Sequence, residues 1–155
     1  MHRKTILLVE DNSEDEFLVK RAFNRTRLPV EIVVAKDGGE ALDFLLGTAS
    51  FAERRFEILP DLVLLDLDLP KINGLSVLRS IRSEPRTRLV PVVIFTASAD
   101  EQNRLTAYEL GANSYVVKPA ETPELQTVVQ DLCRYWLSLN SPLHRAPKHP
   151  SAATK

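Results

Sequence analysis

Residues 6–11, with the sequence Ile-Leu-Leu-Val-Glu-Asp, join an apolar run to two adjacent carboxylates. A second apolar run, Leu62 to Leu65, ends in the same way in Asp66. Aliphatic runs without a polar interruption are typical of strands buried on both faces of a parallel sheet. Because the carboxyl ends of parallel strands meet at one edge of the sheet, we expect Glu10, Asp11 and Asp66 to lie together.

Carboxylates gathered in this way predict a bound cation. Two of them about 4 Å apart repel each other by roughly 1 kcal/mol in water and by about 4 kcal/mol at an effective dielectric constant of 20. Mg2+ would relieve this repulsion, because it accepts one or two carboxylates, keeps several waters and binds phosphate oxygens in its remaining positions. The cluster therefore indicates a Mg2+ site and phosphoryl chemistry.

The composition limits the classes of function that are open to the chain. Its 155 residues are enough for one domain with a substantial core. The net charge of -1 provides no overall field to hold nucleic acid or an anionic membrane. All apolar runs are far shorter than the roughly 20 residues of a membrane span. We therefore expect no nucleic acid or membrane as partner, and a cytoplasmic location.

The cysteine and histidine residues narrow the possible chemistry further. A single cysteine, Cys133, excludes an internal disulfide and suits a reducing compartment. All three histidines, His2, His144 and His149, lie near the chain ends, so the expected folded body contains none. This argues against Ser-His-Asp or Cys-His catalysis, a His-ligated metal and a phosphohistidine carrier. The available chemistry is that of carboxylate, lysine and hydroxyl groups.

Short aliphatic runs alternate with longer segments of helical periodicity along the chain. The predicted strands are Thr5–Glu10, Glu31–Ala35, Leu62–Leu65, Val92–Thr96 and Ser114–Val117. Strict alternation of strands and helices predicts an α/β fold in which helices cover both faces of a five-stranded parallel sheet. The sheet should be doubly wound, as a (βα)5 three-layer sandwich, with ligands bound outside the carboxyl ends of the strands.

Helix-start signals lie between the predicted strands. Ser13, Asp37 and Ser98 are each followed three residues later by a glutamate, which is the pattern of a capping box. The last helix should begin with a Thr122 cap and Pro123 in its first turn. A helix that begins near Gly74 should end before Glu84-Pro85.

The fourth and fifth strands also end in polar residues, namely Thr96 and Lys118. Taken alone, Asp66 can be a turn or helix cap, Thr96 a β-branched strand residue and Lys118 a surface lysine before a proline. Together they supply what an aspartyl nucleophile needs: a cation site, a hydroxyl for a phosphoryl oxygen and an ammonium for the remaining charge. We therefore interpret the strand ends as one site.

These motifs resemble the receiver domain of bacterial two-component response regulators, over roughly residues 4 to 139. The segments that carry the resemblance are ILLVEDN (6–12), LVLLDLDLP (62–70), VVIFTA (92–97) and YVVKP (115–119). The resemblance implies a flavodoxin-like fold and a signalling phosphoacceptor, not an enzyme beyond self-catalysed phosphorylation and dephosphorylation. It also implies a phosphoryl donor, a sensor histidine kinase.

The resemblance assigns a role to each site residue. Asp66 would accept the phosphoryl group, and Thr96 and Lys118 would hold it. Mg2+ would bind Asp11 and Asp66 directly, Glu10 through water and the backbone carbonyl of Asp68; Glu10 stands where the family often has aspartate. Tyr115 would be the switch partner of Thr96, turning inward when the threonine moves toward phosphate.

Two other classes of site fit the sequence less well. Asp66-Leu67-Asp68 looks like the D-x-D of haloacid-dehalogenase-type phosphatases, but Leu69-Pro70 follows it and the chain is short for a cap domain. A Rossmann nucleotide-binding site is disfavoured because no G-x-G-x-x-G follows any strand. A receiver-shaped interaction module that dimerises without phosphorylation remains the alternative function.

The expected domain layout leaves protein contacts as the output. Residues 1–139 would form the receiver domain and residues 140–155 a disordered Pro-rich tail. The last helix carries a wide apolar stripe, from which we predict a homodimer, with a monomer whose tail lies over the helix as the alternative. The stripe consists of Leu125, Val128, Val129, Leu132, Cys133, Tyr135, Trp136 and Leu137.

Two further segments are candidate contact surfaces. Residues 47–59 form a long connection that is a candidate interaction loop. The histidine kinase would dock on the helix from Glu14 to Arg25, together with the Lys118-Pro119 loop. The long middle connection, the LGANSY segment at 110–115 and the single-domain layout are similar to the small regulators that partner cyanobacterial phytochromes, which would make the kinase a phytochrome-type light sensor.

Overall fold

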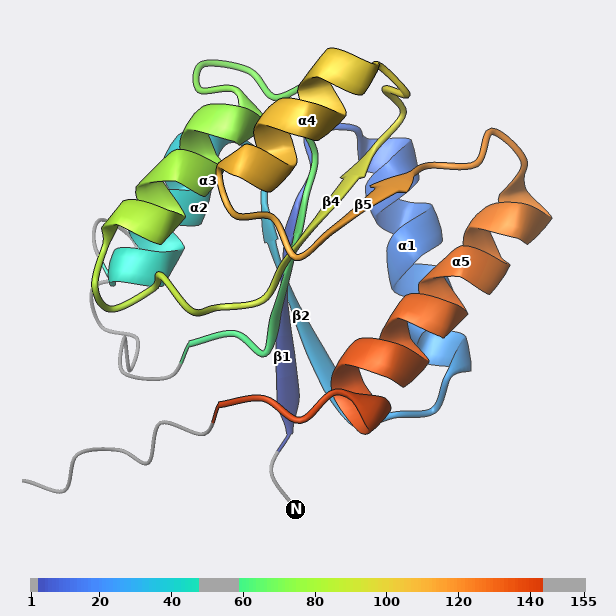
Figure 1. Ribbon diagram of the computed structural model, residues 1–155. Helices are drawn as coiled ribbons and strands as arrows, with labels where there is room; N and C mark the ends of the chain where they lie inside the picture. Colours follow the sequence, from blue (N-terminus) through green and yellow to red (C-terminus); the bar gives the residue numbers. More distant parts are fainter. Residues whose placement is uncertain (1–2, 48–58, 144–155) are drawn as a thin grey trace, which may run out of the picture.

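The computed structural model describes residues 3–47 and 59–143 as a five-stranded sheet with helices on both faces (Figure 1). The strands are β1 Lys4–Val9, β2 Val30–Ala35, β3 Leu62–Leu65, β4 Val92–Thr96 and β5 Ser114–Val117. The helices are α1 Ser13–Arg25, α2 Gly38–Leu46, α3 Gly74–Ser83, α4 Glu101–Glu109 and α5 Thr122–Arg134. A π-helical segment, η2 Tyr135–Leu139, continues α5.

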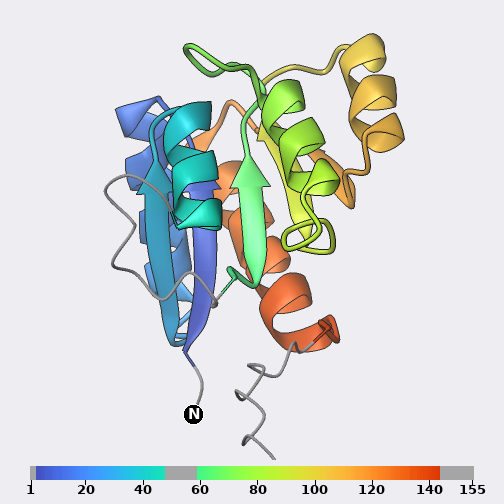
Figure 2. The ribbon, with the colours of Figure 1, turned by 90° about the vertical axis from the view of Figure 1, so that its left-hand side faces the viewer.

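The sheet is parallel throughout, with the strand order β2-β1-β3-β4-β5. Helices α1 and α5 pack together on one face, and α2, α3 and α4 cover the other, as the two views show (Figures 1 and 2). The strand order reverses between β1 and β3, because the chain first adds β2 on one side of β1 and then β3 on the other. The doubly wound, flavodoxin-like (βα)5 prediction is confirmed.

The strand alternation divides the core into two layers, because successive side chains point to opposite faces of a sheet. Leu7, Val63 and Ile94 pack under α2, α3 and α4, whereas Leu8, Leu64 and Phe95 pack under α1 and α5. The same strands therefore serve both layers, which explains why they are apolar without interruption. Each fully buried aliphatic or aromatic side chain of this kind contributes about 1.5 to 3 kcal/mol to folding.

Of the four predicted N-cap residues, one is confirmed, and in the other three helices a nearby residue is the N-cap. Asp37 caps α2, where its side chain accepts a hydrogen bond from the amide of Glu40 at 2.8 Å. The cap of α1 is Asn12, not Ser13, and the cap of α4 is Asp100, not Ser98. The N-cap of α5 is Glu121, without a side-chain hydrogen bond, so Thr122 is the first helical residue.

The last helix differs from the expected stripe in its final turns. In η2, backbone hydrogen bonds span five residues, as from the amide of Asn140 to the carbonyl of Tyr135 at 2.6 Å. Cys133 and Leu137 are buried in the core, so they are not the surplus apolar surface that the stripe suggested. Tyr135 is exposed and Trp136 is half-buried.

Two predicted segments lie outside the described residues in whole or in large part. They are the candidate interaction loop, of which residues 48–58 are not described, and the predicted tail, of which residues 144–155 are not described. Within the described ranges, no helix combines the length and the apolar character that crossing a membrane requires.

The start of α3 packs directly on the backbone at the end of β3. The amide of Gly74 donates a hydrogen bond to the carbonyl of Leu67 at 3.0 Å. A Cβ atom on Gly74 would lie 2.2 Å from the carbonyl oxygen of Asp66 and 2.7 Å from the Cα of Leu67, both of which are backbone atoms. This close approach fixes the backbone that carries Asp66, and only glycine allows it.

We therefore predict that Gly74→Ala lowers the free energy of unfolding by about 2 to 3 kcal/mol, because backbone must move to admit the methyl group. The matched control is Gly39→Ala in α2, where the nearest atom to the new Cβ is a side-chain oxygen of Asp37 at 3.2 Å. That change should alter stability by less than about 1 kcal/mol. Urea unfolding measures both, and equal effects would contradict the prediction.

Candidate functional site

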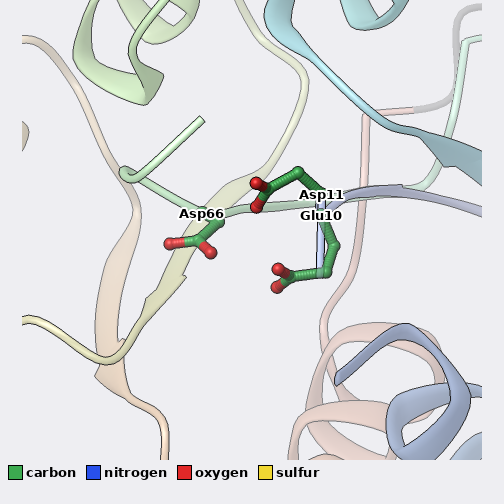
Figure 3. Close-up of side chains that lie close together, drawn as sticks. All are labelled: Glu10, Asp11 and Asp66. Atoms are coloured by element: carbon green, nitrogen blue, oxygen red, sulfur yellow. The ribbon is translucent and has the colours of Figure 1, made fainter. Parts of the chain in front are cut away.

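The acids predicted from the sequence lie together at the carboxyl edge of the sheet. Val9 of β1 pairs with Leu65 of β3, so the next residues along the two strands, Glu10 and Asp66, lie side by side. Carboxylate oxygens of Glu10, Asp11 and Asp66 all lie within 4.8 Å of one another (Figure 3). Glu10 and Asp66 are buried, whereas Asp11 is exposed. The prediction that two strands deliver three acids to one place is confirmed.

Lys118, which follows β5, joins this cluster. Its amide donates a hydrogen bond to the carbonyl of Thr96 at 2.7 Å, which fixes its backbone beside β4. Its ammonium contacts Glu10 Oε2, lies 3.0 Å from Asp66 Oδ2 and lies 3.1 Å from Asp15 Oδ2. The side chain of Lys118 is only 8% exposed. Each of the three ammonium protons thus has a carboxylate acceptor.

Burial and contacts between charged groups shift the pKa values of Glu10 and Lys118. Burial raises the pKa of Glu10 to about 7, although the hydrogen bond and the charge of Lys118 lower it. Burial would lower the pKa of Lys118, but its contacts with Glu10 and Asp66 outweigh burial and raise that pKa above the usual value. Lys118 is therefore a fixed positive charge at neutral pH, and it does not fully compensate the acids around it.

The oxygen ligands and the excess negative charge fit a hard divalent cation. Glu10, Asp11, Asp15 and Asp66 face a single ammonium group. Asp11 is exposed and makes no ion pair with another described residue, so its oxygens are accessible to a cation. Mg2+ requires oxygen donors of this kind and tolerates several waters. The backbone amide of Asp68 donates a hydrogen bond to Asp66 Oδ1 at 3.3 Å.

Thr96 and Tyr115 meet at Ser98 in the loop between β4 and α4. The buried Thr96 hydroxyl accepts a hydrogen bond from the Ser98 amide at 3.4 Å, and the Tyr115 hydroxyl donates one to the Ser98 carbonyl at 2.8 Å. The guanidinium of Arg104 lies 5.6 Å from the centre of the Tyr115 ring. Among the described residues, no hydrogen bond joins Thr96 to Asp66. Thr96 and Tyr115, the predicted switch pair, are therefore connected through Ser98.

Two of these contacts are not predicted from the sequence. The sequence pattern predicts Ser98 as a helix cap and places Asp15 in the helix-start pattern between Ser13 and Glu16. Asp15 contacts a lysine that lies 103 positions away in the chain. One feature of the sequence could have indicated this contact: Asp15 lies in the first turn of a helix that begins soon after Glu10 and Asp11.

The profile of the response regulator receiver domain matches residues 6–130. This chain belongs to that family. The probable methanogenesis regulatory protein FilR2 of Methanothrix harundinacea is 40% identical over 135 residues, which are 87% of this chain and 84% of FilR2. Response regulator Rcp1 of Synechocystis is 35% identical over 134 residues, which are 86% of this chain and 89% of Rcp1.

Solved structures give the same result for this receiver domain. The phosphorylated cyanobacterial phytochrome response regulator RcpA superimposes with a TM-score of 0.87 at 36% identity, over 92% of this chain and 100% of RcpA. The Mn2+-bound form of Rcp1 superimposes with a TM-score of 0.85 at 33% identity, over 91% of this chain and 99% of Rcp1. The protein is thus a receiver-domain response regulator of two-component systems, related to phytochrome response regulators.

Family membership defines the general class of activity. Receiver domains are signalling phosphoacceptors that work with histidine kinases, and they are not classical enzymes. The acidic cluster of this receiver domain matches that class, and Rcp1 has been crystallised with a divalent cation.

The raised pKa of Glu10 predicts a specific pH dependence for the metal-free protein. The carboxyl keeps its proton up to about pH 7 when folded but only to about pH 4.5 when unfolded, so its contribution to stability is present below pH 4.5 and lost as the pH rises through 7. Relative to the wild type, Glu10→Gln should therefore gain on the order of 2 to 3 kcal/mol between pH 4.5 and 8. Urea unfolding in the presence of a chelator measures the difference.

The matched control for this experiment is Glu31→Gln, which changes an exposed glutamate of β2. Its difference in stability from the wild type should not vary across the same pH range. A constant difference for Glu10→Gln as well would show that the buried carboxyl does not titrate in this window.

Proposed function

We propose that this receiver domain accepts a phosphoryl group from a histidine kinase on Asp66, with Mg2+ as cofactor, and signals through a changed protein-binding surface. The observation that carries the proposal is the position of the Asp66 carboxylate between two kinds of charge. One of its oxygens lies 3.0 Å from the Lys118 ammonium, and the carboxylate also shares the acidic cluster with Glu10 and Asp11. Phosphoryl transfer to a carboxylate needs positive charge beside it, which the Lys118 ammonium and a cation held by the acidic cluster would supply.

In the transfer step, an Asp66 oxygen forms a bond to phosphorus while the bond from phosphorus to the donor breaks. When the donor is phosphohistidine, the leaving imidazole nitrogen keeps the electron pair and takes up a proton. The Lys118 ammonium offsets part of the negative charge on the phosphoryl oxygens. Glu10, Asp11, Asp66 and the Asp68 carbonyl would hold Mg2+, whose chemistry there is to neutralise and orient the phosphoryl oxygens.

We assign the switch to Thr96 and Tyr115. A phosphoryl group on Asp66 adds about -1.5 to -2 charge and strong hydrogen-bond acceptors. The Thr96 hydroxyl, which now accepts from the Ser98 amide, would turn to donate to a phosphoryl oxygen. Because Ser98 also holds the Tyr115 hydroxyl, a change at Thr96 alters the support of Tyr115. The output would be a rearranged surface of the β4–α4 loop and β5.

We further propose that the phosphodonor is a phytochrome-type kinase in the cytoplasm. The support is the similarity to Rcp1 and to RcpA, a cyanobacterial phytochrome response regulator. The kinase would dock on α1, where Phe17 is 61% exposed, and on the Lys118-Pro119 loop. Phe17 lies in the helix whose first turn adjoins the site, so a docked kinase would face Asp66.

A homodimer through the last helix is the third part of the proposal. A groove of about 480 Å3 lies between β5 and the α5–η2 segment. It is lined by Asn113, Ser114, Val116, Val128, Asp131, Leu132, Tyr135 and Trp136. Tyr135 is 49% exposed and stacks edge-on against Trp136, with ring centres 4.9 Å apart. Exposed aromatic residues beside a groove are typical of interface anchors.

We predict that the protein incubated with Mg2+ and a small acyl phosphate gains the mass of one phosphoryl group. Asp66→Asn and a chelator should each abolish the adduct, because the first removes the nucleophile and the second the cation. Intact-mass spectrometry measures the outcome. Asp68→Asn is the matched control and should still form an adduct, since only the backbone of Asp68 is assigned to the site.

Two outcomes would contradict this prediction. An adduct that persists in Asp66→Asn would place the phosphoryl group on another residue. No adduct on the wild type, from the acyl phosphate or from a phosphorylated histidine kinase, would favour a receiver-shaped interaction module that dimerises without phosphorylation.

For the dimer, we predict that Tyr135→Arg raises the dimer dissociation constant at least about tenfold, because it places a charge in the apolar interface. Sedimentation velocity over a dilution series measures this constant. Phe17→Arg is the matched control, since Phe17 is also an exposed aromatic residue on a helix but lies away from the groove. A wild-type monomer at all concentrations, or equal effects of both variants, would contradict the dimer.

A further inference from the structure

Lys118 has a carboxylate partner outside the acidic cluster, on a different element of the fold. Asp15 Oδ2 lies 3.1 Å from the Lys118 ammonium, and Asp15 belongs to the first turn of α1. The Asn12 side chain accepts a hydrogen bond from the Asp15 amide at 3.0 Å, which fixes the backbone of Asp15. The Asp15 side chain is 34% exposed, whereas that of Lys118 is 8% exposed. Asp15 therefore reaches the buried ammonium from the helix side.

The two other partners of Lys118 are shared with the rest of the site. Glu10 and Asp66 belong to the cluster of oxygens that could hold a cation, and Asp66 is also the proposed phosphoacceptor. A cation or a phosphoryl group would draw on the oxygens that now hold the ammonium. Asp15 is not part of that cluster, so its contact with Lys118 does not depend on them.

We propose that Asp15 is a positioning residue for Lys118. It holds the ammonium beside Asp66 when Glu10 and Asp66 are engaged by a cation or by the incoming phosphoryl group. This inference rests on the proposed function, because the work of Lys118 is to offset phosphoryl charge. Lysine has a flexible four-carbon stem, and a fixed acceptor limits the positions that its ammonium can take. Asp15 acts through Lys118 and touches neither the phosphoryl group nor the cation.

Asp15 also has an effect that would slow phosphorylation, whereas its positioning of Lys118 would speed it. Its negative charge repels an anionic phosphodonor, so repulsion alone predicts that neutralising Asp15 speeds phosphorylation. Glu14 allows the two effects to be separated. It lies in the same turn of α1, is exposed, and its side chain forms no ion pair or hydrogen bond with another described residue. Glu14→Gln and Asp15→Asn remove the same charge from the same helix N-terminus, and only the second replaces a carboxylate partner of Lys118 by a neutral amide.

The first arm of the test measures the position of Lys118 in the metal-free protein, without phosphorylation. The 15N–1H signal of a lysine ammonium is observed when hydrogen bonds hold the group and protect it from exchange with water. We expect this signal for Lys118 in the wild type and in Glu14→Gln, its loss or broadening in Asp15→Asn, and its return in Asp15→Glu. An unchanged signal in Asp15→Asn would overturn the inference.

The second arm measures the rate of phosphorylation by a small acyl phosphate at saturating Mg2+. Asp15→Asn should react about three- to tenfold more slowly, the effect of losing one charge-assisted hydrogen bond to a reacting group. Glu14→Gln should react at the wild-type rate or faster, and Asp15→Glu should recover most of the rate. On a Lys118→Met background, Asp15→Asn should slow the reaction no further.

The results distinguish this inference from the proposed function. Asp15→Asn that reacts as fast as Glu14→Gln, or that slows the Lys118→Met protein equally, would overturn the positioning role. Both variants lose the same interaction with the helix dipole, and Asp15→Asn alone also weakens the ion pair with Lys118, so its thermal midpoint should be the lower of the two. If the wild type forms no adduct, the proposed function fails, and the ammonium signal still decides whether Asp15 holds Lys118.

Discussion

The structure depends on one ammonium group among four carboxylates. Glu10, Asp11, Asp15 and Asp66 gather where β1 and β3 end, and Lys118 contacts three of them. Burial raises the pKa of Glu10 and so favours its neutral form, whereas the hydrogen bond and the charge of Lys118 favour the charged form. Removing one partner of a buried ion pair commonly costs about 3 to 5 kcal/mol, because it leaves the other charge uncompensated. Lys118 thus keeps the edge folded while leaving enough negative charge for a divalent cation.

The topology of the sheet explains why these charges meet. Strand order reverses between β1 and β3, so α1 and α2 leave toward opposite faces and the strand ends remain accessible between them. The register that pairs Val9 with Leu65 then sets Glu10 beside Asp66 without any loop being required. On the far side, Gly74 lets α3 pack against the backbone of Asp66. The core of the site is therefore built on the ends of strands and the start of a helix, whereas Ser98, which contacts both Thr96 and Tyr115, lies in the loop between β4 and α4.

The sequence predicted those features of the structure that depend on residues close together in the chain. Short apolar runs located all five strands to within one residue at each end. The central strands β3 and β4 are buried along their whole length, whereas β2 and β5 lie at the edges of the sheet and are partly exposed. The cap at Asp37 was predicted by a pattern four residues long. Ser98 fitted the same pattern, but its hydroxyl accepts hydrogen bonds from the Asp100 amide and the Asn103 side chain, and Asp100 caps α4 instead. The Asp15–Lys118 contact joins residues 103 positions apart, and no local pattern encodes it.

The attachment of α4 determines where a change at Thr96 can be transmitted. At the C-terminal end of α4, Arg82 donates hydrogen bonds to the carbonyl of Gly111 at 2.8 Å and to the side chain of Asn113 at 2.8 Å. Ala107 is the one buried residue of α4, so the rest of this helix is weakly attached to the core. Its N-terminal end follows Ser98, the residue that supports Tyr115. In the proposed switch, a change at Thr96 would therefore act first on the start of α4 and on Tyr115 in β5, and β5 also lines the groove beside α5.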